Sequence, residues 1–214
     1  MERYYKFCLL ALLIAMAGDI LVSWLLPLFY KGYSSTKMSI STLGNPNSPV
    51  RLPFNIWMFI EGVLFLCALP SIYKCYHAVS GKLTVTLMIF TAVFAVGACI
   101  FTCFFSVNET KDIVTTASKI HGAGSVIGFM LFLFAPLLTA ILSFKGGETA
   151  LGVLGAVCFA AALVFFSLFV MSDKESFAGT VISWEGLWQR LCLLFMYLPL
   201  IAAAVKRIAD NNGV

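Results

Sequence analysis

Residues 83–107 read LTVTLMIFTAVFAVGACIFTCFFSV, a run of 25 residues without a single Asp, Glu, Lys, Arg, His or Pro. A helix needs about 20 apolar residues to cross a hydrocarbon core about 30 Å thick, so this run is long enough to span a membrane. It lacks the alternation of apolar and polar residues that marks a barrel strand, and a helix satisfies its backbone amides within the segment, as lipid requires. The run therefore predicts a transmembrane helix.

Runs of the same kind precede and follow it. We predict spans at residues 7–30, 54–73, 83–107, 120–144, 149–172 and 187–205. Of the 10 acidic and 14 basic residues of the chain, these spans contain only Asp19, Glu61 and Arg190. The chain is 61% hydrophobic and 11% charged, against about 25% charged residues in a soluble domain. The sequence thus predicts an all-α integral membrane bundle of six transmembrane helices, in one membrane domain over residues 1–214, and excludes a soluble protein.

The charge pattern also bears on partners and on the first span. The net charge of +4 is spread along the chain without a basic stripe interleaved with aromatic residues, which argues against a nucleic-acid partner.

Arg3 and Lys6 precede an apolar run containing Ala15-Met16-Ala17, a pattern that signal peptides share. Because the run continues for 24 residues, we favour a retained anchor over a cleaved signal peptide.

Six spans place both termini on one side of the membrane. The segments on that side hold seven bases (Arg3, Lys6, Lys74, Lys82, Lys145, Lys206 and Arg207), and the loops on the other side hold six (Lys31, Lys37, Arg51, Lys111, Lys119 and Lys174). The positive-inside bias is therefore weak. We still expect a cell-membrane protein with both termini in the cytoplasm, because this orientation keeps the cytoplasmic connections 74–82 and 145–148 short.

The same parity brings loops 31–53, 108–119 and 173–186 together on the opposite face. Polar residues in these loops, or on the helical turns next to them, are therefore candidates for one shared site. The candidate ligand-binding residues are Ser39, Ser41, Asn55, Glu61, His121, Glu185, Gln189 and Arg190.

Ionisable residues inside a span are costly and suggest function. Asp19 lies near the middle of its span, where it could be a protonated carboxyl bonded to a neighbouring helix, part of a proton or cation path, or a ligand contact. Glu61 and Arg190 lie at depths from which their long side chains can meet, either as a structural clasp or as the base of a ligand pocket.

Histidine and cysteine content excludes several chemistries. Of the two histidines, only His121 lies near a span end on the polar face, so a bis-histidine haem or a multi-histidine metal cage cannot form, and we expect neither metal nor cofactor. The seven cysteines lie mostly within spans, which is typical of cysteines that pack in a core rather than form disulfides.

A set of hydrolase residues can be assembled from Ser39 or Ser41 with His121 and Glu61 or Glu185, although no Gly-x-Ser-x-Gly motif surrounds either serine.

Small residues recur at helical spacing on several spans, as they do where membrane helices pack closely. The stripes are Gly152, Ala156 and Ala160; Gly124 and Gly128; and Ala11, Ala15, Asp19 and Ser23. Packing within the bundle is the main interpretation, and a homo-oligomer seam is the alternative.

Two short elements in a fixed order, with a histidine between them, resemble a known family. They are Ile40-Ser41-Thr42-Leu43-Gly44 and Gly186-Leu187-Trp188-Gln189-Arg190, with His121 between, over about residues 10–205. Together they resemble domain-of-unknown-function family 998, a set of prokaryotic multi-span membrane proteins. That family is distantly similar to the autophagy modulators and the lipid-remodelling factors of GPI-anchor synthesis, which implies six spans and suggests lipid handling. The resemblance would imply an acidic residue at the position of Thr42. It would also imply an Asp near the end of the third span, where this chain has Asn108-Glu109.

These observations lead to three functional hypotheses. The first is a non-enzymatic membrane protein that binds a lipid headgroup or amphiphile beneath the polar loops, with Arg190 and His121 at its anionic part. The second is a membrane hydrolase or transferase for a lipid or lipid-linked substrate, with His121, Ser41 and Glu61 as catalytic residues. The third is a proton- or ion-coupled transporter that uses Asp19.

Overall fold

A computed structural model describes residues 2–108 and 114–212, and within them all regular structure is helical. The main helices are α1 (Glu2–Leu25), α2 (Arg51–Tyr76), α3 (Gly81–Phe94), a π-helical segment (Ala95–Ile100), α4 (Phe101–Phe104), α5 (Thr116–Phe132), α6 (Ala135–Lys145), α7 (Thr149–Met171) and α8 (Glu185–Asn212). Short 3-10 turns cover Leu26–Phe29, Ile40–Gly44, Glu175–Phe177 and Val181–Ser183. Six helical segments are long and apolar enough to span a membrane, which confirms the predicted all-α six-span bundle.

Two of the predicted continuous spans are composite. The span at 120–144 breaks after Phe132 and restarts at Ala135, because Pro136 has no N–H to continue the helix and its ring occupies the preceding turn. The span at 83–107 contains the π-helical segment and ends at Phe104. Of the two irregularities, the π-helical segment contributes a residue, Ala98, to the wall of the cavity described below.

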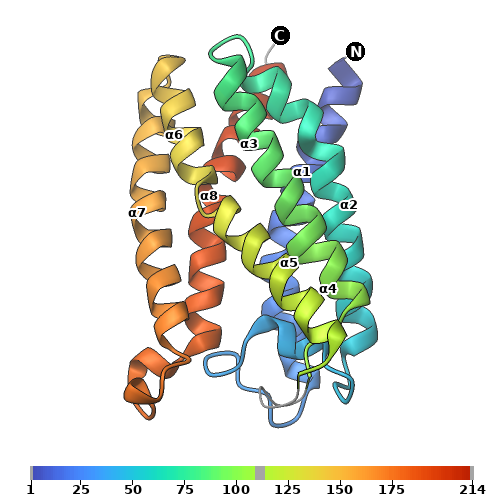
Figure 1. Cartoon of the computed structure of the whole chain (residues 1–214). Helices are drawn as coiled ribbons and strands as arrows, with labels where there is room; N and C mark the ends of the chain where they lie inside the picture. The colour runs from blue at the N-terminus through green and yellow to red at the C-terminus, as the bar shows by residue number, and fades with distance from the viewer. Residues whose placement is uncertain (1, 109–113, 213–214) are drawn as a thin grey trace.

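The bundle is held together by a central aromatic cluster and by close helix contacts. Phe65, Phe94, Phe132 and Tyr197 have ring centroids 4.5–6.3 Å apart and are buried. Helix α1 packs against α2 and α8, α5 packs against α3 and the π-helical segment, and α7 packs against α6 and α8. Figure 1 shows α5 crossing the front of the bundle at a tilt, with α7 at the side.

The small-residue stripes of α1 and α5, and Gly152 of the α7 stripe, serve this packing. A Cβ on Gly124 would lie 2.8 Å from the carbonyl oxygen of Gly97 in the π-helical segment, and Gly152 packs against the ring of Phe144 on α6. Ala156 and Ala160, the other members of the α7 stripe, are exposed, so a homo-oligomer seam there stays a prediction.

Both termini lie at one end of the bundle, and the longer loops gather at the other (Figure 1). At the end with the termini, Glu148 accepts hydrogen bonds from Lys206 at 2.6 Å and Arg207 at 2.9 Å, which ties the start of α7 to the end of α8. At the loop end, the segment between α1 and α2 includes the 3-10 turn Ile40–Gly44, which with Ser39 is called the serine turn below, and it ends where α2 begins at Arg51. The loop end forms the floor of the site.

Candidate functional site

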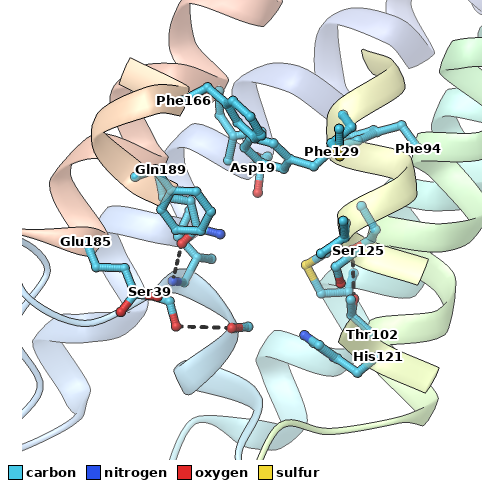
Figure 2. A pocket seen from close by; sticks show the side chains of 18 of the residues that line it. Asp19, Ser39, Phe94, Thr102, His121, Ser125, Phe129, Phe166, Glu185 and Gln189 are labelled. Carbon is cyan, nitrogen blue, oxygen red and sulfur yellow. Dashed lines mark hydrogen bonds between the residues drawn. The ribbon is translucent and has the colours of Figure 1, made fainter. Parts of the chain in front are cut away.

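A cavity of about 430 Å³ lies inside the loop half of the bundle, between the first loop and helices α2, α3, α5, α7 and α8. Most of its wall is apolar and includes Phe54, Met58, Phe94, Phe129, Phe166, Phe169 and Leu193. Polar side chains lie at the end nearest the loops, with Ser39, Glu185 and Gln189 on one side and His121, Thr102 and Ser125 on the other (Figure 2). The cavity is thus amphipathic, with a size typical of small-molecule sites.

The cavity opens sideways between α5 and α7. Val126 and Met130 on α5 and Val170 on α7 line the cavity and are at the same time 56%, 50% and 50% exposed. Phe129 bridges the two helices, with its ring centroid 6.1 Å from that of Phe166 and 6.0 Å from that of Phe169. Both helices belong to segments that are long and apolar enough to span a membrane, so in a bilayer an opening between them would face lipid.

The first loop supplies a network of hydroxyls. Ser39 Oγ lies 3.1 Å from Ser41 Oγ and 3.0 Å from Thr42 Oγ1. Gln189 holds the same loop from α8, because its Oε1 accepts a 2.7 Å hydrogen bond from the backbone N–H of Ile40. This bond fixes which way the amide points, so the Gln189 NH₂ group is a donor at the cavity wall.

His121 lies on the first turns of α5, is 6% exposed and lines the cavity. Its Nδ1 lies 2.8 Å from the backbone carbonyl oxygen of Phe105, which can only accept, so Nδ1 carries the proton. In the neutral ring Nε2 is then a hydrogen-bond acceptor. The ring is held by its Nδ1 side and leaves Nε2 for a ligand.

Asp19 and Glu61 meet at the deep end of the cavity, and Tyr197 of α8 joins them. The Tyr197 hydroxyl donates to Asp19 Oδ2 at 2.9 Å and lies 3.5 Å from Glu61 Oε1. Asp19 and Glu61 are 5% and 1% exposed, and both line the cavity. The sequence identified both acids but not Tyr197, although a tyrosine inside an apolar span needs a partner for its hydroxyl.

The predicted Glu61–Arg190 pair is not formed between these two described residues. The Arg190 guanidinium donates instead to the carbonyl oxygens of Ser23 at 2.9 Å, Ser35 at 2.7 Å and Gly186 at 3.0 Å. It also donates to the Tyr33 hydroxyl at 2.9 Å. Arg190 is therefore a clasp between α1, the first loop and α8, and it does not line the cavity.

Tyr33, a polar residue of the first loop, was not among the predicted ligand-binding residues. Its hydroxyl lies 2.8 Å from the carbonyl oxygen of Ser39 and 3.1 Å from that of Met38, so it fixes the start of the serine turn. Burial raises the pKa of Tyr33 despite the opposing effect of Arg190. The phenol consequently stays protonated and can donate to these carbonyls over the physiological range.

The predicted ligand-binding residues thus divide into two groups. Ser39, Ser41, Glu61, His121, Glu185 and Gln189 line the cavity. Asn55 borders a separate surface groove with Phe59 and Phe104, and Arg190 belongs to the clasp. Within the described part of the chain, no group of three or more His, Cys, Asp or Glu residues could hold a metal ion. Glu109, one of the departures from the resemblance, lies outside the described residues.

Comparisons with known proteins give one match. Searches among curated proteins and among solved structures found no match. A family model described as a protein of unknown function, DUF998, matches residues 9–206, which is nearly the whole chain. The chain therefore belongs to the DUF998 family, as the serine and Gln-Arg elements with His121 between them indicated.

Proposed function

We propose that this protein holds a membrane lipid or a similar amphiphile in the cavity between α5 and α7. The observation that carries the proposal is an amphipathic cavity of about 430 Å³ that opens laterally between two membrane-spanning helices. An acyl chain would lie along the aromatic wall, and the headgroup would meet the polar residues at the loop end. A lateral entrance lets such a ligand arrive from the bilayer without crossing water.

A variant that fills the cavity tests this proposal. Ser125 of α5 lines the cavity, so Ser125→Phe should occupy the space of the ligand. Ile127 on the same helix is 55% exposed and borders a different groove, so Ile127→Phe is the matched control. Native mass spectrometry of gently extracted protein should find a lipid retained by the wild type and by Ile127→Phe but not by Ser125→Phe. Equal retention by both variants would reject the proposal.

One observation favours a second candidate function, a lipid-directed hydrolase or transferase. The Phe105 carbonyl orients the His121 ring so that Nε2 is an acceptor at the cavity wall, as a general base requires. The hydroxyls of Ser39 and Ser41 bond to each other, and neither is hydrogen-bonded to His121 among the described residues. His121 could thus act as a general base, but neither serine is positioned as its nucleophile. Binding of an amphiphile is therefore the first proposal, and catalysis is the second.

Two variants of His121 separate catalysis from structure. In His121→Asn the amide N–H can replace Nδ1 at the Phe105 carbonyl but no group replaces Nε2, whereas His121→Ala loses both. If His121 is a general base, both variants should be inert against a panel of lipid esters and lipid-linked substrates. If its role is structural, His121→Asn should keep the thermal stability that His121→Ala loses, and the wild type should turn over no member of the panel.

A further inference from the structure

The loop end of the cavity offers a hydrogen-bond acceptor on α5 and a donor on α8. His121 is 6% exposed, and no hydrogen bond reaches its Nε2 within the described part of the chain. With the proton on Nδ1, Nε2 of the neutral ring can only accept. Gln189 Oε1 already accepts from the backbone N–H of Ile40, so the Gln189 NH₂ group is left to donate. Figure 2 shows His121 and Gln189 on opposite sides of the cavity, with both side chains directed into it.

This end of the cavity has no cation to receive an anionic group. None of the described lining residues is Lys or Arg, and Glu185 brings a carboxyl group to the same end. Arg190, the base expected at an anionic headgroup, donates to backbone carbonyls and does not line the cavity. A phosphate would therefore place its charge beside an imidazole lone pair and a carboxyl group in a medium of low dielectric constant.

The serine turn adds groups that both donate and accept. Ser39 Oγ lies 3.1 Å from Ser41 Oγ and 3.0 Å from Thr42 Oγ1, and each of these hydroxyls has one proton and two lone pairs. A hydroxyl on the ligand has the same inventory, so it can donate to His121 Nε2 and accept from the Gln189 amide. An ammonium group has no lone pair for the amide, and a phosphodiester has no proton for Nε2.

From these contacts we infer that the ligand carries a neutral polyhydroxyl headgroup, of the glycerol or sugar type, which donates to His121 Nε2 and accepts from the Gln189 amide. This inference rests on the proposed amphiphile-binding function and names the ligand class. It places the headgroup at the loop end and leaves the chain along the aromatic wall. Specificity follows because any headgroup that lacks a donor or an acceptor leaves a polar group unpaired inside the cavity.

Four probes with an 18-carbon unsaturated chain test the inference. They are 1-oleoylglycerol, methyl oleate without a donor, oleylamine without an acceptor, and the anionic 1-oleoyl lysophosphatidic acid. Each is titrated into the purified full chain in detergent at pH 8, where a histidine is ordinarily neutral, and the bound fraction is measured by native mass spectrometry. Oleoylglycerol should bind about tenfold or more tightly than each of the other three, because only its headgroup pairs both sides without a charge.

A variant of His121 removes the acceptor alone. His121→Asn keeps an N–H for the Phe105 carbonyl oxygen and places no group where Nε2 was. Its preference for oleoylglycerol over methyl oleate should fall to about twofold or less. The matched control is His77→Asn, because His77 caps the other end of α2, is exposed and does not line the cavity. This control should keep the wild-type preference.

A variant of Gln189 reverses the donor. Gln189→Glu keeps an oxygen for the Ile40 N–H and replaces the NH₂ group by a carboxylate oxygen. An ammonium group then gains a charged acceptor, so oleylamine should bind more tightly than oleoylglycerol, the opposite of the wild-type order. A Gln189 that only holds the serine turn would produce no such reversal.

The cavity-filling variant distinguishes failure of the inference from failure of the proposed function. If Ser125→Phe abolishes probe binding but the wild type binds another probe as tightly as oleoylglycerol, the cavity binds amphiphiles and the headgroup inference is wrong. If Ser125→Phe reduces the binding of no probe, the proposed function fails and the inference fails with it. An unchanged preference in folded His121→Asn also overturns the inference; should that variant not fold, the lack of a reversal in Gln189→Glu overturns it instead.

Discussion

Arg190 shows how a residue that suggests a ligand site can have a structural role. It is 4% exposed, and its guanidinium donates to backbone carbonyls of α1, the first loop and α8. In Arg190→Ala these carbonyls lose their donor, and buried unpaired groups cost about 1–3 kcal/mol each. We expect Arg190→Ala to lower the free energy of unfolding by about 3 kcal/mol or more, measured by thermal unfolding in detergent.

A lysine and a surface arginine provide the controls for Arg190. Arg190→Lys keeps the charge but lacks the planar fork, so its stability should fall between those of Arg190→Ala and the wild type. Arg51 is exposed and its Nη2 lies 3.3 Å from Ser106 Oγ, so Arg51→Ala should change stability by about 0.5 kcal/mol or less. If Arg190→Ala melts like the wild type but loses amphiphile binding, Arg190 is a ligand residue and the clasp interpretation is wrong.

The error over Glu61 and Arg190 has a geometric cause. The sequence fixes how deep a residue lies only if the first residue of the helix is known. Helix α2 begins at Arg51 rather than at 54, which places Glu61 about 15 Å into the helix, whereas Arg190 is about 8 Å into α8. Tyr197 lies two turns deeper than Arg190 on the same face of α8, and it is this residue that reaches Glu61.

At the scale of elements, the sequence predicts the number and limits of the spans better than their internal breaks. Pro136 could have indicated the break between α5 and α6, because proline is favoured in the first turn of a helix and disfavoured inside one. The π-helical segment Ala95–Ile100 left no such mark in the sequence. Its irregularity coincides with the contact between Gly97 and Gly124, which depends on how two helices far apart in sequence approach each other.

The contact between Gly97 and Gly124 gives an element-scale prediction. A Cβ on Gly97 would collide with the carbonyl oxygen of Gly124, so Gly97→Ala must push α5 away from the π-helical segment. Overpacking of this kind costs about 1–3 kcal/mol. We expect a lower melting temperature for Gly97→Ala, measured by thermal unfolding in detergent, and a weaker retention of lipid because α5 forms one side of the opening.

Gly122 is the matched control for this helix contact. It lies on α5, two residues before Gly124, and a Cβ there would meet no atom within 4 Å. Alanine is preferred over glycine in helices by about 1 kcal/mol, so Gly122→Ala should leave stability unchanged or raise it. Helix propensity alone would raise the stability of both variants, so a loss in Gly122→Ala as large as that in Gly97→Ala would contradict the explanation by close approach of the two backbones.

At the scale of the molecule, the parity of the loops was sufficient to gather most of the candidate site. Ser39, Glu61, His121 and Gln189 come from four distant segments and line one cavity, because consecutive spans cross in alternate directions and so place the first, third and fifth loops on the same face. The lateral opening between α5 and α7 was not predictable in this way. It depends on the tilt of α5 across the bundle (Figure 1), and apolar periodicity gives no information about tilt.

Orientation in the membrane is a property of the whole molecule, and the charge pattern favours one orientation only slightly. The end with the termini carries seven bases and the loop end six, of which Lys111 lies outside the described residues. With both termini in the cytoplasm, the full chain carrying green fluorescent protein at its C-terminus should fluoresce in a bacterial host, and the same fusion to alkaline phosphatase should be inactive. The reverse pattern would place the cavity in the cytoplasmic leaflet.

A charge variant shows whether this small bias decides the orientation. Lys82 and Lys145 are exposed at the end with the termini, and each flanks a short connection, so replacing both with Gln should not disturb packing. That end would then hold five bases against six, and the positive-inside rule predicts a mixed population in which both fusions give signal. A double variant that kept the wild-type pattern would show that the folded bundle itself, with Glu148 bonded to Lys206 and Arg207, fixes the orientation instead.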